Sequence, residues 1–496
     1  MLLSDKMKNL RRIIMEINWI KTGSFRIISL VKEFYYAERL QFIKIVFAAQ
    51  ILFSLLVFTV SGSEMFADND RVCFVGDSIT HGGSYHILVR EYYLTRFPGR
   101  TLTTFNCGLS GDTAGGALQR LDNDVLVHKP TAVTVMFGMN DVNRNLYGKK
   151  DSEVTEQILG DRKKAIDKYT GNMEKLVKIL REKNVKVTLI TPTPYEQTAA
   201  IPASNFFGCA DALAQCAKIV TGLAGQYNTG LISFNQPMTD IDNTLQTADK
   251  KATIIGSDRI HPGAFGHAVM AGLFLKDQHV PAEVASVKID AAKMSVSTGN
   301  CKVSGLTGNA GSMTFTCQEE ALPMPNFPEL DQAEKYIPFT TLFNQEIILV
   351  SSLPQGKYAV LIDGQNIGEW PAGELAKGVN IANLNTPQQR QAQQVRTLNR
   401  QLCNIQELLR NLYKTTLTLK YNKIDDSNPA ALKKGMDDFL EKNKNASSLN
   451  YYKLLFSQYQ KLKDEQNDNL LKIEELEKNI YASSKPVAHV FELKKI

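Results

Sequence analysis

The first half of the chain alternates short apolar runs with helical stretches, and this alternation limits the folds it can adopt. The runs have the length of buried strands, and the stretches between them repeat hydrophobic residues with a helical period. Strands are predicted over residues 72–75, 101–106, 132–137, 185–190 and 230–234, and helices over 84–96, 114–127, 161–183, 209–226 and from near Gly263. Continuously apolar strands alternating with helices are typical of a parallel sheet covered on both faces.

Changes in composition divide the 496 residues, too many for one ordinary domain, into several segments. Residues 68–283 form the predicted α/β domain. Over 284–383 apolar residues alternate with polar or small ones, and Asp363-Gly364 signals a tight turn, which indicates a small antiparallel β unit. Residues 384–496 are predicted to be a C-terminal helical region. Its helices, over 388–414, 429–443 and 447–480, carry partial apolar stripes typical of core or helix pairing.

An uncharged apolar run over residues 45–60 precedes the first predicted strand. It is short for a membrane span, which needs about 20 apolar residues, and closer to the core of a signal peptide, with small residues following at 61–63. We expect residues 1–67 to be a leader with an export signal; an uncleaved membrane anchor and a buried core helix are the alternatives. The expected location is periplasmic or extracellular, or membrane-anchored through residues 45–60.

Cysteine content and charge narrow the class of protein further. Seven cysteines are few and odd in number, and no Cys or His cluster has metal-ligand spacing. Two local pairs have spacings that allow disulfides if the chain is exported, with free thiols as an equal alternative: Cys209/Cys216 and Cys301/Cys317. The net charge of +6 is mild for this length, and no basic groove with interleaved aromatic residues is present. Nucleic acid is therefore not an expected partner.

Four polar clusters follow apolar strands or lie in a late loop. They are residues 76–78 (Gly-Asp-Ser), 106–112, 138–141 (Gly-Met-Asn-Asp) and 258–262. Because chemistry gathers at the carboxyl ends of parallel strands, we expect the first three to meet at one edge of the sheet. Each cluster alone has a simpler interpretation, as a helix cap, a turn or a surface-loop pair. Their combination favours a catalytic site.

The residue types in these clusters fit nucleophilic catalysis by serine. A serine hydroxyl barely ionises at neutral pH and needs an imidazole to remove its proton, and the imidazole needs a carboxylate to fix its tautomer. Ser78, His261 and Asp258 supply these groups, and one turn would deliver both triad partners, three residues apart. The oxyanion formed on attack requires N–H donors, which the Ser78 amide, an amide at Gly111 and the Asn140 carboxamide would provide.

The four clusters, in this order, resemble the sequence blocks of the SGNH (GDSL-type) hydrolase family over roughly residues 70–278. The resemblance implies a three-layer α/β/α sandwich, similar to flavodoxin, and the following site: nucleophile Ser78, oxyanion donors Gly111 and Asn140, and triad partners Asp258 and His261. Ile79, where the family name has Leu, and Arg259, between the triad acid and His261, leave the mechanism intact. Beyond this segment there is only a general likeness to exported bacterial multidomain members of the family.

The expected activity is hydrolysis of an ester through an acyl-enzyme, with no metal and no organic cofactor. An O-acyl ester on a carbohydrate, such as an acetylated polysaccharide, is the expected substrate, because the chain looks exported and carries additional β structure. A lipid esterase, lysophospholipase or thioesterase is an alternative, and would need an apolar acyl channel near residues 142–160 and 195–210. A non-catalytic binding or scaffold protein on the same core is the alternative from another class. The oligomeric state is left open.

Overall fold

The computed structural model describes residues 63–446 and 448–496. The apolar run at 45–60 and most of the predicted leader lie outside the described residues, so export and anchoring stay predictions. Among the helices that are described, none is both long and apolar enough to cross a membrane.

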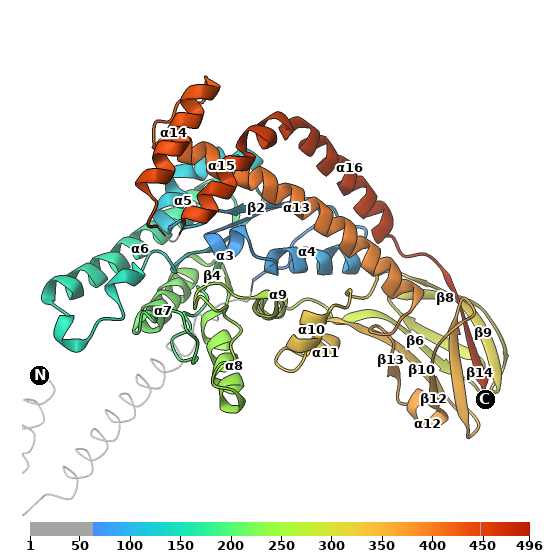
Figure 1. Cartoon of the computed structure of the whole chain (residues 1–496). Helices are drawn as coiled ribbons and strands as arrows, with labels where there is room; N and C mark the ends of the chain where they lie inside the picture. The colour runs from blue at the N-terminus through green and yellow to red at the C-terminus, as the bar shows by residue number, and fades with distance from the viewer. Residues whose placement is uncertain (1–62, 447) are drawn as a thin grey trace, which may run out of the picture. The chain divides into compact units, whose positions relative to one another are not determined.

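Five parallel strands form the sheet of the α/β domain, in the order β2-β1-β3-β4-β5 (Figure 1). All four neighbouring pairs are parallel. The strands are β1 (Asp70–Gly76), β2 (Leu102–Gly108), β3 (Ala132–Met136), β4 (Lys186–Ile190) and β5 (Gly230–Ile232). The predicted parallel sheet is confirmed, and its strands begin and end within about two residues of the predicted positions.

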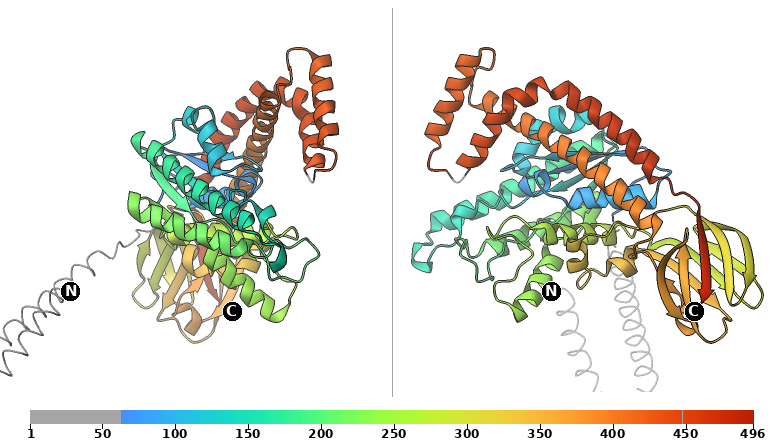
Figure 2. Two further views of the ribbon diagram at one scale, coloured as in Figure 1. Left: turned by 90° about the vertical axis from the view of Figure 1, so that its left-hand side faces the viewer. Right: turned by 45° about the vertical axis from the view of Figure 1, so that its right-hand side comes forward.

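The strand order determines which helices cover each face. The chain moves from β1 to β2 toward one edge, and from β2 through β5 toward the other, so right-handed crossovers place the connecting helices on opposite faces. One face carries α4 (Tyr85–Arg96), which packs against α9 (Ala264–Asp277); the other carries α5 (Ala114–Arg120), α6 (Glu156–Glu182) and α7 (Cys209–Tyr227) (Figure 2). This is the expected α/β/α sandwich. An additional helix, α8 (Asn235–Ala248), was not predicted.

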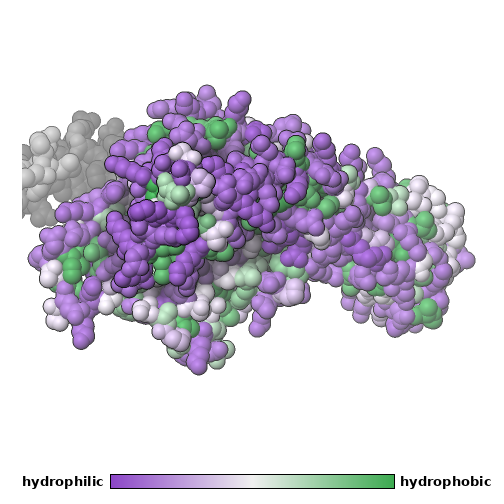
Figure 3. All heavy atoms as spheres, turned by 45° about the horizontal axis from the view of Figure 1, so that its top comes forward, coloured by the Kyte–Doolittle hydropathy of each residue, from purple (hydrophilic) through white to green (hydrophobic). Residues whose placement is uncertain are grey.

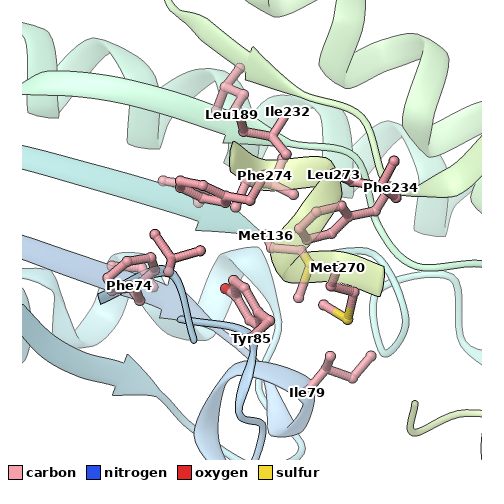
Figure 4. Packing of buried hydrophobic residues seen from close by; sticks show 14 of the residues in the cluster. Phe74, Ile79, Tyr85, Met136, Leu189, Ile232, Phe234, Met270, Leu273 and Phe274 are labelled. Atoms are coloured by element: carbon pink, nitrogen blue, oxygen red, sulfur yellow. The ribbon is translucent and has the colours of Figure 1, made fainter. Parts of the chain in front are cut away.

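A cluster of aromatic and aliphatic side chains fills the space between the sheet, α4 and α9 (Figure 4). The rings of Phe74 on β1 and Tyr85 on α4 pack edge to face with their centroids 6.1 Å apart, and the ring centroids of Tyr85 and Phe234 are 5.7 Å apart. Phe274 on α9 packs on Phe74 at 6.1 Å, and all four side chains are fully buried. Ile79 belongs to the same cluster, so close packing fixes the backbone directly after Ser78.

The β unit consists of two sheets, with strand orders β13-β10-β6-β7 and β12-β11-β14-β9-β8. Its strands are β6 (Glu283–Asp290), β7 (Ser295–Gly299), β8 (Cys301–Asn309), β9 (Ser312–Glu319), β10 (Gln345–Ser351), β11 (Lys357–Ile362), β12 (Gln365–Pro371), β13 (Val379–Asn380) and β14 (His489–Lys495). One pair departs from the antiparallel prediction, because β6 and β10 run parallel. The long connection between them, which includes α10 (Pro328–Ala333) and α11 (Phe339–Phe343), makes this possible. A further helix, α12 (Ala372–Leu375), precedes β13.

In its described residues the C-terminal region has four helices and one strand, which corrects the prediction of a purely helical segment over 384–496. The helices are α13 (Pro387–Tyr421), α14 (Pro429–Lys442), α15 (Leu449–Asp464) and α16 (Gln466–Ser484). After them β14 inserts between β9 and β11 of the β unit. Its alternation buries His489, Phe491 and Leu493, a pattern too short to predict a strand after the long helices. The long helix α13 packs against α4 and β2 of the α/β domain.

All seven cysteines are free and buried in the described part of the chain. Cys209 and Cys216 lie on α7 seven residues apart, about 10 Å along the helix axis, which is beyond the reach of a disulfide. Cys301 and Cys317 lie on the paired strands β8 and β9, also as thiols. Neither pair is bridged in the structure.

A pair of buried glutamates lies where the two sheets of the β unit approach α4 and α13. Glu319 on β9 and Glu346 on β10 are almost fully buried, and neither carboxyl oxygen of Glu346 has a hydrogen-bond partner in the described part of the chain. Burial raises the pKa of Glu319 to about 7, and burial together with the Glu319 charge raises the pKa of Glu346. Gln388 of α13 donates to Glu319 at 3.4 Å, and Arg96 of α4 is the nearby cation that opposes the shift of Glu346.

This pair should make the fold less stable in mild alkali. A pKa raised by folding stabilises the protonated native state, and that contribution is complete below the ordinary value near 4.5 and is lost as pH rises through about 7. Glu346→Gln keeps a donor and removes one charge, so it should melt about 2 °C or more above wild type at pH 8. Thermal melts at pH 5 and pH 8 measure this, with the exposed Glu320→Gln as control. A variant that melts below wild type at pH 8 would contradict the assignment.

Candidate active site

Strand register brings three of the predicted clusters to one edge of the sheet. Gly76 of β1 is level with Gly108 of β2 and with Met136 of β3. Ser78 follows its strand by two residues, and the loops that carry Gly111 and Asn140 leave the neighbouring strands at the same edge. The register of the strands therefore places these three clusters together at the carboxyl edge of the sheet, as expected from the sequence.

Ser78 is the first residue of α3 (Ser78–His81), a single turn directly after β1. The cap of this turn is Asp77, whose carboxylate accepts a hydrogen bond from the Ile79 amide at 2.9 Å. Burial raises the pKa of Asp77 to about 6. Because Asp77 caps the turn, the Ser78 hydroxyl is not used as a cap and is available for another partner.

That partner is His261, which lies 183 residues away in sequence. The Ser78 Oγ and His261 Nε2 are 2.7 Å apart, and His261 Nδ1 and Asp258 Oδ2 are 2.5 Å apart. Partial burial of Asp258 opposes its ionisation, but hydrogen bonds from the His261 ring and from the His261 and Ile260 amides outweigh this and lower its pKa. The side chains of His261 and Asp258 are 46% and 50% exposed, so the site is open to solvent.

The turn that holds Asp258 and His261 is built by its own side chains. Asp258 Oδ1 accepts from the amides of Ile260 and His261, both at 2.9 Å, which directs the imidazole toward the carboxylate. Arg259 has φ of +68° and a buried side chain. Its guanidinium donates to the carbonyls of four residues in the preceding loop: Glu196, Ala199, Ile201 and Ala203. Arg259, treated from the sequence as a neutral variation, is thus the anchor of the turn.

The loop after β2 requires glycine at two positions. A side chain at Gly108 would come within 2.3 Å of the His81 backbone, and Gly111 has φ of +78°. The Ser110 amide donates to Nδ1 of His81 at 3.1 Å. Burial, with the charges of Arg410, Lys414 and Arg120, lowers the pKa of His81 to about 3, so the imidazole stays neutral and accepts this bond. Within the described residues, the Gly111 amide N–H donates no hydrogen bond to the protein.

Both the oxygen and the nitrogen of the Asn140 carboxamide form hydrogen bonds within the protein. Arg144 donates to Oδ1 at 3.0 Å, and because arginine only donates, this contact assigns the orientation of the amide. Asn140 Nδ2 donates one hydrogen to the Asp112 carbonyl at 2.8 Å. Among the described residues its second hydrogen has no acceptor. The neighbouring Asp141 accepts from the amides of Ala114 and Gly138, and burial raises its pKa to about 7.

Comparisons with known proteins point to acylhydrolases and esterases. Residues 74–269 match the GDSL-like Lipase/Acylhydrolase family. An acetylxylan esterase of Geobacillus stearothermophilus is 23% identical over 223 residues, which cover 42% of this chain and 93% of that one. The crystal structure of an acetylxylan esterase from the same organism, Axe2, covers 43% of this chain and 96% of its own, at 23% identity and a TM-score of 0.35.

A second solved structure is similar over a much longer part of the chain. It is BT4096, described as a gut microbial diltiazem-metabolizing enzyme, with 29% identity and a TM-score of 0.77, covering 88% of this chain and 100% of that one. This similarity extends beyond the α/β domain, whereas the family match ends at residue 269.

The fold and these matches define a class of protein: residues 74–269 form a domain of the GDSL-like lipase/acylhydrolase (SGNH) family. It is an esterase of that family, an enzyme that hydrolyses ester bonds.

Proposed function

We propose that this esterase removes short acyl groups, above all acetyl, from hydroxyls of a carbohydrate, with Ser78 as nucleophile. The observation that carries the proposal is the chain of hydrogen bonds from Ser78 through His261 to Asp258, open to solvent at the carboxyl edge of the sheet. The three groups have the order and spacing that an activated serine requires.

In the proposed reaction, His261 takes the Ser78 proton as Oγ attacks the ester carbonyl. The oxyanion of the tetrahedral intermediate accepts hydrogen bonds from the Ser78 and Gly111 amides and from Asn140 Nδ2. The intermediate collapses as His261 protonates the leaving alcohol, which gives an acyl-enzyme. A water deprotonated by His261 then attacks the acyl carbonyl, and the acid is released from Ser78. The ionised Asp258 stabilises the imidazolium in both halves of the reaction.

Several observations support a short acyl group. A cavity of about 520 Å³ lies between α6 and α7 and reaches the loops considered for an acyl channel only at Tyr147 and Gly208. Four charged residues contribute to its lining: Arg162, Lys163, Asp167 and Asp211. Most residues on the molecular face in Figure 3 are hydrophilic, with hydrophobic ones scattered in small groups. The acetylxylan esterase is named for an acetylated carbohydrate.

A chain-length series tests the acyl preference. We expect kcat/KM on p-nitrophenyl acetate to exceed that on the octanoate by about tenfold or more, because the charged lining of this cavity does not favour a long alkyl chain. Release of acetate from acetylated xylan or xylo-oligosaccharides tests the alcohol side. A preference for the octanoate would refute the acetyl proposal and favour a lipid esterase.

The proposal extends to location. A polymeric carbohydrate ester lies outside the cell, so we propose that the enzyme is exported through the apolar run at residues 45–60. The N-terminal sequence of the mature protein decides this: a start shortly after residue 60 supports cleavage, and a start before residue 45 on a cytoplasmic protein contradicts export.

A further inference from the structure

Helix α13 reaches the loop that carries Gly111, although about 300 residues separate them in sequence. The helix packs along β2, and two of its side chains, Arg410 and Lys414, lie one turn apart and contact the loop over residues 108–112. Figure 1 shows α13 running past β2 and α4. The contacts of Arg410 and Lys414 are made to backbone carbonyls of the loop, so they act on its conformation directly.

Arg410 fixes the start of this loop. Its side chain is buried, its Nε donates to the Gly108 carbonyl at 2.5 Å, and its guanidinium forms a two-pronged pair with Asp124, one contact of which is 2.7 Å. Asp124 also pairs with Arg120, which holds the other end of the loop through Asp112 Oδ2 at 2.8 Å. Two buried arginines that share one carboxylate therefore clamp both ends of the loop.

Lys414 acts on the centre of the loop. Its Nζ donates to the carbonyl of Ser110 at 3.0 Å. That carbonyl and the Gly111 N–H belong to the same peptide group. A cation on the carbonyl draws electron density through the amide and makes the N–H a stronger donor, and hydrogen bonds in such chains strengthen one another. The Gly111 N–H is the group that the proposed reaction uses at the oxyanion.

We propose that Lys414 is a positioning residue of the esterase: it holds and polarises the Ser110–Gly111 peptide so that the Gly111 amide binds the oxyanion. The inference rests on the proposed reaction at Ser78. It makes part of α13 a component of the catalytic module and gives a function to the C-terminal region. The interaction strengthens as charge develops on the substrate oxygen, so its loss should lower kcat and leave KM nearly unchanged.

Two substitutions at this position and one elsewhere on the helix test the proposal. Lys414→Met removes the charge and the donor at similar length, and Lys414→Arg keeps both. Arg400→Met on the same helix breaks the pair with Glu91 of α4, at 2.8 Å, without contact to the loop. We expect Lys414→Met to lower kcat about 10- to 100-fold on p-nitrophenyl acetate, less than or comparable to the loss of a whole oxyanion donor. KM should change less than threefold, Lys414→Arg should recover most of the kcat, and Arg400→Met should keep it.

A tetrahedral analogue separates this role from a general loss of structure. Methylboronic acid adds to the Ser78 hydroxyl and places a boronate oxygen at the oxyanion position, so its Ki should rise in parallel with the fall in kcat for Lys414→Met. The inference is overturned if kcat and Ki stay within twofold of wild type, or if Arg400→Met loses kcat as Lys414→Met does. If Lys414→Met does not fold, Lys414→Leu, which also lacks the charge and the donor, takes its place with the same expected losses. A Ser78→Ala variant that keeps turnover would refute the proposed reaction itself. If Ser78→Ala is inactive and Lys414→Met keeps the wild-type kcat, only the role of Lys414 is refuted.

Discussion

Ser78→Ala should lower kcat on p-nitrophenyl acetate by about 10⁴- to 10⁶-fold, because in the proposed reaction the Ser78 oxygen forms the acyl-enzyme. The fold should be unaffected. The Ser78 side chain is half-buried and its Oγ bonds only to His261 in the described structure, whereas the turn that carries it is capped by Asp77. Steady-state kinetics and circular dichroism on the purified variant measure both quantities.

Ser84→Ala is the matched control for this variant. Ser84 is also half-buried and lies at the start of a helix, α4, where its side chain makes no capping hydrogen bond. It should keep kcat within about twofold of wild type. If Ser78→Ala keeps wild-type turnover instead, the chain does not act through this serine. That result would favour the interpretation as a binding or scaffold protein.

Asp258→Asn should lower kcat by about 10³- to 10⁴-fold with little change in stability. Asparagine still offers an oxygen to the amides of Ile260 and His261, so the turn is kept. Its NH₂ group, however, would donate to His261 Nδ1, which forces the proton onto Nε2. The ring nitrogen that faces the Ser78 hydroxyl then lacks the lone pair needed to accept a proton, and the base is lost.

The control for Asp258→Asn is Asp249→Asn, since Asp249 also accepts from the amide two residues ahead, Lys251, at 2.9 Å on an exposed turn. That variant should keep full kcat. The lowered pKa of Asp258 means that its stabilising contacts are complete above the ordinary value near 3.8 and are lost only as pH falls further. An Asp258→Asn variant with wild-type kcat at pH 7 would show that this carboxylate does not orient the imidazole.

The extent of sequence-based prediction differs between parts of the molecule. The strands of the α/β sheet were predicted because buried parallel strands are continuously apolar. Strand β14 was missed because seven alternating residues after long helices give a weak local signal, and its pairing partners are over 120 residues away. The parallel pairing of β6 with β10 was missed for a related reason, since strand direction depends on the path of the intervening chain.

The chemistry of the site follows the same division. The residue types at Ser78, Asn140, Asp258 and His261 are those that the proposed acyl transfer requires, and they could be recognised along the chain. The sequence could not show that Arg259 is buried or that it anchors a loop. Arginine side chains are usually exposed, and the local sequence does not distinguish a buried arginine from an exposed one.

By itself the sequence determined the parallel sheet, the order of the site clusters and the class of reaction, because periodicity and residue chemistry are local properties. Only the tertiary structure decided that α13 clamps the loop of Gly111 through Arg410 and Lys414. Those contacts join side chains of one helix to backbone carbonyls about 300 residues earlier. Backbone carbonyls are present in every residue, so no sequence pattern marks the ones that a distant helix will bind.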